Sequence, residues 1–253
     1  ADIFGYPCDI DALKKIVGKR KIKIITDSAQ APYSFYKGRL TGTLSDIGGF
    51  SLNFHKIINT GEGGIIVTNN HTLAKRAKLI RNHGEVRIKS KKKSILSNII
   101  GHNFRMGEIE AAIGLQQYKK LKKIVKSRTF MINKLIANLE KLQCFILPKI
   151  EKNFSHNFYI LPIVLNENNI GKRSKIVKLL RQTGIEGANE GYVNLHTLPM
   201  FRQQIAYGKK HFPWSLSNKK YNYNKGICKV AEELHNKSFI SLEVCLYDLN
   251  SRT

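Results

Sequence analysis

Apolar residues change their spacing along the first part of the chain. They recur three and four positions apart over residues 9–17, which predicts a helix that Gly18 ends. Residues 21–26 form a nearly continuous apolar run, typical of a strand buried in a parallel sheet. Asp27 follows this run at once. Because open α/β sheets bind ligands at the carboxyl ends of their strands, Asp27 is a candidate functional carboxylate.

Further strands and helices alternate up to residue 139. Short apolar runs predict strands over 47–53 and 63–68, and helical spacing predicts a helix over 73–82 with Thr72 as its cap. The polar, lysine-rich residues 85–96 predict a surface loop. A long helical pattern runs from residue 106 to 139, with a break expected near Arg128. A helix of this length commonly bridges two domains.

The pattern starts again after Pro148. It predicts a strand over 158–165, a helix over 174–183 and an irregular region to Pro213. The alternation in the first half indicates the α/β class, and the second half is typical of a smaller α+β domain. We therefore expect two domains, residues 1–127 and residues 128–253, the second incomplete at its end.

The basic composition raises a question about partners. The 253 residues carry 43 Lys+Arg against 18 Asp+Glu, a formal net charge of +25, while 42% hydrophobic content excludes general disorder. Such an excess is compatible with nucleic acid, an anionic membrane or a polyanionic small molecule. The lysines, however, are spread over helices such as Lys119–Lys123 and one loop, without a nucleic-acid-binding motif. We therefore expect neither a nucleic acid nor a membrane partner.

Cysteine usage and hydropathy indicate a cytoplasmic protein with reduced thiols. The cysteines are scattered and form no CxxC pair, so they predict neither a disulfide framework nor a metal site. They are Cys8, Cys144, Cys228 and Cys245. No apolar run reaches the length of a membrane-spanning helix, and no signal-peptide pattern opens the chain.

Glycines, hydroxyls and one lysine follow the strand predicted over 47–53. Lys56 is the single lysine of residues 48–64, which end in Thr60 and a glycine cluster. Backbone N–H groups and hydroxyls near a strand end can hold a phosphate, and a lysine with few carboxylates nearby can act as an amine nucleophile toward a carbonyl. Asp27 could keep a pyridinium nitrogen protonated. Each feature alone is more often structural, but together they match the needs of a pyridoxal phosphate enzyme.

Several separated motifs, in order, support a family resemblance. They are TDSAQA, FSLNFHKIINTGEGGIIVTNN, LIRNHG and GHNFRMGEIEAAIGLQQYKKL. Over nearly its whole length the chain resembles the DegT/DnrJ/EryC1/StrS family of sugar aminotransferases. The resemblance implies a fold-type I, pyridoxal 5'-phosphate-dependent enzyme with a mixed, mostly parallel sheet flanked by helices. It also implies amino transfer from glutamate or glutamine to a keto-sugar, nucleotide-linked, in amino-sugar and surface polysaccharide biosynthesis.

The resemblance assigns roles to five residues around the cofactor. Lys56 matches the family's Schiff-base lysine, which also moves the proton. Asp27 matches the aspartate that pairs with the pyridine nitrogen, and Gln30 matches a residue beside the ring. Ser51 matches a hydroxyl that binds the cofactor phosphate. Asn103 matches an asparagine that reaches the phosphate from a partner subunit, which implies a homodimer with a shared active site.

Other positions are matched less closely. Arg105 corresponds to a place where an anionic substrate group can bind, and Tyr192 and His196 resemble a Tyr…His segment near the sugar. Asn53 and Asn59 depart from the family signature without removing a named catalytic group. The family's pattern also includes an upstream phosphate-binding turn and a stacking aromatic residue that are not visible here, and a final helix. We therefore expect an internal fragment that lacks N-terminal and C-terminal segments of the enzyme.

Three alternatives stay open from the sequence. In sugar dehydratases of the same family a histidine replaces the lysine, and the presence of Lys56, with His55 beside it, favours transamination. The charge leaves a basic nucleic-acid-binding protein as a second alternative. A non-catalytic fragment or pseudoenzyme is the third.

Overall fold

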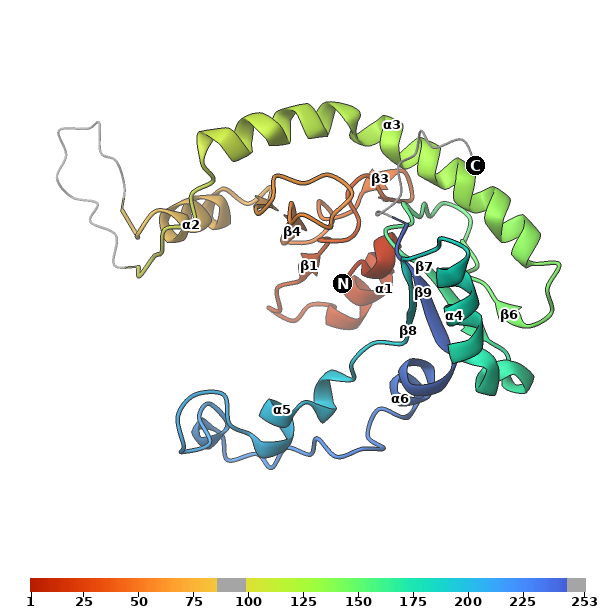
Figure 1. Ribbon diagram of the computed structural model, residues 1–253. Coiled ribbons are helices and arrows are strands. Elements are labelled where there is room, and N and C mark those ends of the chain that lie inside the picture. Colours follow the sequence, from red (N-terminus) through yellow and green to blue (C-terminus); the bar gives the residue numbers. More distant parts are fainter. Residues whose placement is uncertain (86–98, 245–253) are drawn as a thin grey trace, which may run out of the picture. The chain divides into compact units, whose positions relative to one another are not determined.

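The computed structural model describes residues 1–85 and 99–244. They divide into two compact units, and most of their helices and strands are labelled in Figure 1. The first unit comprises Ala1–Asn133, Lys149–Ile160 and Val244, and the second comprises Lys134–Pro148 and Leu161–Glu243. The domain boundary expected between residues 127 and 128 stays a prediction. Lys89 and most of the loop predicted over 85–96 lie outside the described residues, as does Cys245.

The first unit combines short strands with three helices. Its elements are the 3₁₀ turn Ile3–Gly5, α1 (Ile10–Val17), β1 (Ile25–Asp27), β2 (Phe35–Tyr36), β3 (Arg39–Leu40), β4 (Ile47–Ser51), β5 (Gly64–Val67), α2 (His71–Arg81) and the first part of α3 (Glu108–Leu139). The Asp9 carboxylate caps α1 by accepting the N–H of Ala12, and Gly18 ends it at φ 57°. This predicted helix is therefore confirmed.

The sheet of the first unit is mixed, as predicted. Its strand order is β1-β4-β5, in which β1 pairs with β4 in parallel and β4 pairs with β5 antiparallel. The register places Asp27 opposite Gly49, and Ser51 opposite Gly64. A separate antiparallel pair joins β2 and β3. Asp27 therefore ends its strand at the same edge of the sheet where β4 turns into the lysine-bearing loop.

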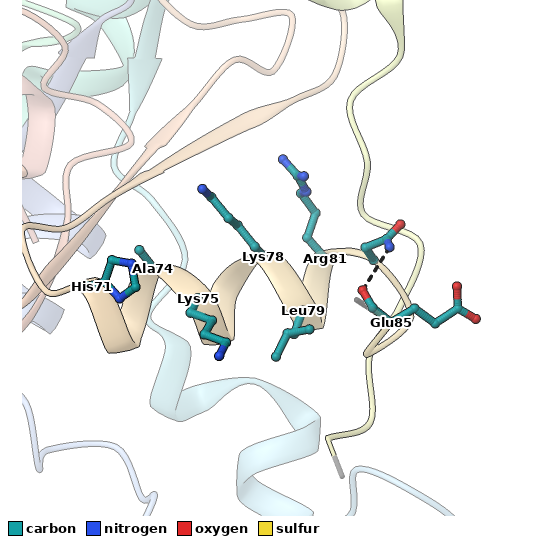
Figure 2. A pocket seen from close by; sticks show the side chains of 8 residues that line it. His71, Ala74, Lys75, Lys78, Leu79, Arg81 and Glu85 are labelled. Carbon is teal, nitrogen blue, oxygen red and sulfur yellow. Dashed lines mark hydrogen bonds between the residues drawn. The ribbon is translucent and has the colours of Figure 1, made fainter. Parts of the chain in front are cut away.

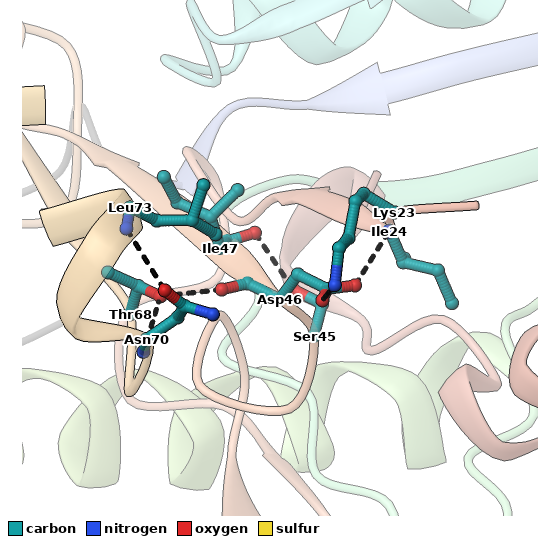
Figure 3. Close-up of polar contacts among 8 residues, drawn as sticks. All are labelled: Lys23, Ile24, Ser45, Asp46, Ile47, Thr68, Asn70 and Leu73. Atoms are coloured by element: carbon teal, nitrogen blue, oxygen red, sulfur yellow. Dashed lines mark hydrogen bonds and ion pairs between the residues drawn. The ribbon is translucent and has the colours of Figure 1, made fainter. Parts of the chain in front are cut away.

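The strand predicted over 21–26 is wrong in its extent and its burial. The strand begins only at Ile25, whose side chain is 73% exposed. The Asp46 carboxylate binds the two residues that precede the strand. Its Oδ2 accepts the Ile24 N–H at 2.9 Å and its Oδ1 binds the Lys23 ammonium at 2.8 Å, as Figure 3 shows. Lys23, followed by the Ile24 N–H, lowers the pKa of Asp46. The Asp46 backbone N–H also donates to Ile24 O at 3.1 Å, so only the acceptor for the Ile24 N–H is a side chain instead of strand backbone.

Two helix predictions also change in detail. Asn70, not Thr72, caps α2, since its Oδ1 accepts the Leu73 N–H at 3.0 Å. The break expected in the long helix near Arg128 is absent from α3, which runs unbroken from the first unit into the second. Arg128 faces the core and is only 3% exposed. It shares that buried stripe with Leu121, Val125 and Ile132, and the lysines at positions 119, 120, 122 and 123 are exposed.

A returning segment, Lys149–Ile160, completes the core of the first unit. Its Phe154 stacks on Tyr6 with ring centroids 5.4 Å apart and meets Tyr36 edge-on at 4.8 Å. Phe158 is fully buried, and its backbone has φ 51°. That left-handed conformation cannot continue a strand, so the strand predicted over 158–165 begins later, at Leu161.

The second unit is built on an antiparallel sheet. Its strand order is β6-β7-β9-β8. Its elements are β6 (Phe145–Ile146), β7 (Leu161–Leu165), the 3₁₀ helix Glu167–Lys172, α4 (Arg173–Gln182), β8 (Ala188–Glu190), the 3₁₀ turns Leu195–Thr197 and Trp214–Leu216, α5 (Pro199–Gln203), α6 (Lys229–Glu233), the π-helix Leu234–Ser238 and β9 (Phe239–Leu242). Alternate residues of β7 and all of β9 are buried, and Val177 of α4 packs with 2% exposure.

Residues 1–85 and 99–244 contain neither a membrane-spanning helix nor a cluster of metal-binding side chains. None of the helices there combines the length and the apolar character that crossing a membrane requires. His, Cys, Asp and Glu side chains form no group of three placed to hold a metal ion in that part of the chain. Cys8, Cys144 and Cys228 are free thiols.

We predict that acid destabilises the first unit through His156. The ring stacks on Phe158 and accepts its N–H at 2.9 Å. Burial lowers the pKa of His156 from 6.5 to about 4, so between these values the unfolded chain takes up a proton that the folded chain does not. The free energy of unfolding should therefore fall as pH drops through this window, by up to about 3 kcal/mol from this residue. Denaturant titrations at pH 7 and pH 4.5 measure the loss.

The control for this prediction is His156→Asn, which keeps an acceptor for the Phe158 N–H but takes up no proton. Its free energy of unfolding should fall less between the two pH values than that of the wild type. Equal losses in both proteins would show that His156 is not the source of the acid sensitivity.

Candidate functional site

Asp27 and Ser51 lie on one face of the sheet of the first unit. Asp27 is registered with Gly49, and side chains two positions apart on a strand share a face, so Ser51 points to the same side as Asp27. The Asp27 Oδ1 accepts the Ala29 N–H at 3.0 Å, and the Ser51 Oγ accepts the Asn53 N–H at 3.2 Å. Asp27 is exposed on this face, and Ser51 is half-buried. The sequence predicts Asp27 at the end of a buried strand, whereas the structure leaves its side chain exposed.

Lys56 sits in a tight loop that links β4 to β5. The loop closes on its own backbone: Leu52 N–H donates to Gly63 O at 2.8 Å, and Thr60 N–H donates to Leu52 O at 3.0 Å. Leu52 and Ile57 anchor it in the core with 4% and 6% exposure. The loop is therefore fixed at both sides of Lys56, which is half-buried.

Tyr159 is the aromatic neighbour of the Lys56 amine. The Nζ donates to the Tyr159 hydroxyl at 3.4 Å and lies 4.8 Å from the ring centroid. Tyr159 is 7% exposed and belongs to the same core cluster as Leu52 and Ile57. The structure thus brings a residue 103 positions away to the predicted reactive lysine.

Asn157 joins the segment that carries Tyr159 to the loop after β1. Its Nδ2 donates to Gln30 O at 3.1 Å and to Pro32 O at 2.9 Å, and its Oδ1 accepts the Tyr159 N–H at 3.0 Å. The side chain is 1% exposed. Gln30 is held a second time, since its Oε1 accepts the Phe4 N–H at 2.6 Å. The predicted residues Gln30 and Lys56 are therefore fixed through one returning segment.

Asn103 and Arg105 lie at the end of α2. Asn103 forms a bridge with Asn82, and the Arg105 Nη1 donates to the Asn82 Oδ1 at 2.7 Å. Asn82 also lines a hollow beside this helix, together with His71, Ala74, Lys75, Lys78, Leu79, Arg81 and Glu85. Figure 2 shows that Lys78 and Arg81 point to one side of α2 and Lys75 to the other, so these cations do not converge on one point.

Tyr192 and His196 belong to the second unit and differ in exposure. Tyr192 is 74% exposed, with its ring 6.4 Å from that of His235. The His196 Nε2 lies 2.8 Å from the Glu232 Oε1, and both side chains are largely buried. The N–H of Gly226 is the largest cause that lowers the pKa of Glu232, and His196 adds to it. His196 is therefore committed to an internal pair, whereas Tyr192 is accessible.

Comparisons with known proteins decide the family. The model of the DegT/DnrJ/EryC1/StrS aminotransferase family matches residues 1–225. The chain belongs to this family. GDP-perosamine synthase of Caulobacter vibrioides is 30% identical to this chain over 200 residues, which are 79% of this chain and 53% of that protein. The chain spans about half the length of the curated relatives it matches.

Solved structures agree with this family and with the predicted α/β fold class. Helicobacter pylori PseC, an aminotransferase involved in the biosynthesis of pseudoaminic acid, has a TM-score of 0.77 at 25% identity, over 96% of this chain and 59% of that one. E. coli GDP-4-keto-6-deoxy-D-mannose-3-dehydratase with bound hydrated PLP has a TM-score of 0.66 at 24% identity, over 75% and 51% of the two chains. The second likeness shows the fold alone. The predicted family and fold class are confirmed.

Sequence reasoning missed Tyr159 and Asn157. Tyr159 lies 103 positions from Lys56 and Asn157 lies 127 positions from Gln30, and no local pattern announces such contacts. One signal was present: the polar pair His156–Asn157 stands directly before apolar residues that lead into a strand. Buried polar side chains are almost always hydrogen-bonded, so a polar pair in that position marks a place where the backbone of another segment must be satisfied.

We predict that Asn157→Ala destabilises the first unit by about 3 kcal/mol or more, because buried backbone groups that lose their partner each cost about 1–3 kcal/mol. The groups affected are Gln30 O, Pro32 O and Tyr159 N. The matched control is Asn69→Ala on the exposed surface of the same unit, which should change stability by no more than about 0.5 kcal/mol. Urea unfolding of both variants is the measurement, and similar small effects would contradict the role given to Asn157.

Proposed function

We propose that the protein is a cytoplasmic, pyridoxal 5'-phosphate-dependent aminotransferase that moves an amino group to a keto-sugar. The observation that carries this proposal is the grouping of Asp27, Ser51 and Lys56 at one edge of the β1-β4 pair, on motifs of a family of aminotransferases. The names of the relatives support sugar substrates.

The residues present fit this cofactor. A carboxylate and a hydroxyl share one face of the sheet, and an amine follows in the next loop. That donor set matches a ring nitrogen, a phosphate and an aldehyde carbon. The exposed carboxylate of Asp27 on this face is accessible to a ring nitrogen. We therefore infer that Lys56, Asp27, Ser51 and Gln30 hold the cofactor.

Each of these side chains has a definite task under the proposal. Pyridoxal 5'-phosphate, when bound, supplies a carbon that accepts an amino group and a ring that accepts an electron pair. Lys56 would hold the cofactor covalently through Nζ, the aldehyde oxygen leaving as water, and would carry the proton between donor and cofactor. The carboxylate of Asp27 holds a proton on the ring nitrogen, and Ser51 donates its hydroxyl to the phosphate. Gln30 lies beside the ring.

Four other residues are assigned to a second subunit and to the substrates. Asn103 is exposed, which suits a side chain that reaches the phosphate of a partner in a homodimer. Arg105 is the cation next to it and would meet an anionic substrate group. Tyr192 and His196 are assigned to the sugar side, Tyr192 by direct contact and His196 through its pair with Glu232.

The substrates follow from the family and the charge. We propose a nucleotide-linked keto-sugar as amino acceptor, and glutamate or glutamine as donor, in the biosynthesis of an amino sugar for a surface polysaccharide. A net charge of +25 would attract a diphosphate-bearing substrate. A sugar dehydratase is the second candidate, since such an enzyme shares this fold. The presence of Lys56 in its loop favours transamination.

We predict that Lys56 is the residue that pyridoxal 5'-phosphate labels after borohydride reduction. Mass spectrometry of the digested protein should find the pyridoxyl group on the Lys56 peptide in the wild type and lose it in Lys56→Ala. The control is Lys37→Ala, which removes an exposed lysine paired with Asp11 at 2.8 Å and should leave the labelling unchanged. Label distributed evenly over surface lysines in the wild type would contradict the proposed function.

We also predict that the cofactor-loaded protein releases 2-oxo acid from an amino donor in a single turnover. Glutamate and glutamine are tested separately, with one equivalent of product expected for each equivalent of protein. Lys56→Arg keeps a cation but lacks a suitable base, so it should slow this release by about 10²–10⁴-fold. Unchanged release in Lys56→Arg would point to another base.

A further inference from the structure

The Lys56 amine meets Tyr159 through both parts of that side chain. The hydroxyl oxygen lies 3.4 Å from Nζ, and the ring centroid lies 4.8 Å from it. The second distance is within the range of a cation–π contact. One tyrosine therefore offers the amine a hydrogen-bond partner and an electron-rich face.

We propose that Tyr159 is a positioning residue for the Lys56 amine, an inference that rests on the proposed function. A lysine that acts as nucleophile and base must alternate between a charged and a neutral nitrogen. A phenol accepts a hydrogen bond from the ammonium and donates one to the neutral amine. Tyr159 can therefore hold Nζ in one place through both states and, unlike a carboxylate, can donate to the lone pair of the neutral amine.

The tyrosine is itself held firmly enough for this role. Its backbone N–H donates to the Asn157 Oδ1 at 3.0 Å, and its side chain packs in a core cluster with Leu52 and Leu121. It is 7% exposed. Because the ring is fixed by packing, contact with it restricts a flexible lysine before any carbonyl arrives, so less conformational entropy is lost on reaction.

The test measures how fast Lys56 captures pyridoxal 5'-phosphate in three variants. Protein and limiting cofactor are mixed, quenched with borohydride at short times, and the pyridoxyl fraction of the Lys56 peptide is followed by mass spectrometry. Tyr159→Phe keeps the ring and its volume but loses the hydroxyl, and should slow capture about threefold. Tyr159→Leu loses the ring contact as well, and should slow capture about tenfold.

A packing control separates positioning from stability. Leu121→Ala opens the same core cluster without removing the groups that contact the amine, so it should retain nearly wild-type capture while lowering the thermal midpoint. The inference would be overturned if Tyr159→Phe captured the cofactor at the wild-type rate and Tyr159→Leu and Leu121→Ala slowed capture equally. Tyr159 would then have a structural role only.

The same experiment distinguishes this inference from the proposed function. Capture at Lys56 in the wild type that is unchanged by both Tyr159 variants overturns the positioning role and leaves the proposed function standing. No preferential capture at Lys56 in the wild type contradicts both. Labelling of Lys37 serves as the internal reference, since it should be equal in all variants.

Discussion

The buried amide of Asn157 is the constraint on which the arrangement of the first unit depends. A side chain that is 1% exposed satisfies Gln30 O, Pro32 O and Tyr159 N, and these groups would otherwise lie unpaired in the core. The same amide forces a glycine at position 5, because a Cβ there would collide with the Asn157 Oδ1. Gly5 also has φ 95°, which side chains rarely allow. One polar residue thus constrains the backbone at three places along the sequence: at Gly5, at residues 30–32 and at Tyr159.

This constraint reaches the candidate site through two routes. Toward the sheet, Asn157 fixes the loop that follows β1 and carries Gln30, three residues after Asp27. Toward the lysine, it fixes the backbone of Tyr159, whose ring lies against Lys56. Residues of α3 close the cluster from a third direction, since Leu121 packs in it. The reactive groups of the site are therefore exposed or half-buried, while the residues that hold them in position lie in the core. This is the usual way to hold reactive side chains in place.

The sequence was most informative where structure is decided by neighbours in the chain. Local spacing and capping residues predicted α1, the strands around Lys56 and the class of the fold, and the order of motifs predicted the family. It failed at residues 21–24, where the carboxylate of Asp46, 22 positions from Ile24, accepts the Ile24 N–H in place of a neighbouring strand. It also missed the contacts of Tyr159 and Asn157, because a side chain that satisfies distant backbone leaves no periodic signal. Apolar content alone likewise could not tell that Ile25 would face outward.

The exposure of Asp27 bears on how the proposed site would work. In water an ion pair contributes little, because solvent screens both charges. A flat ring lying on the face shared by Asp27 and Ser51 would exclude water from the carboxylate and strengthen its attraction for a protonated ring nitrogen. One oxygen of Asp27 is already held by the Ala29 N–H, so the orientation of the carboxylate is set before a ring binds. Under the proposed function, the electrostatic contribution of Asp27 therefore depends on the cofactor covering it. The orientation of its carboxylate is set by the turn after β1.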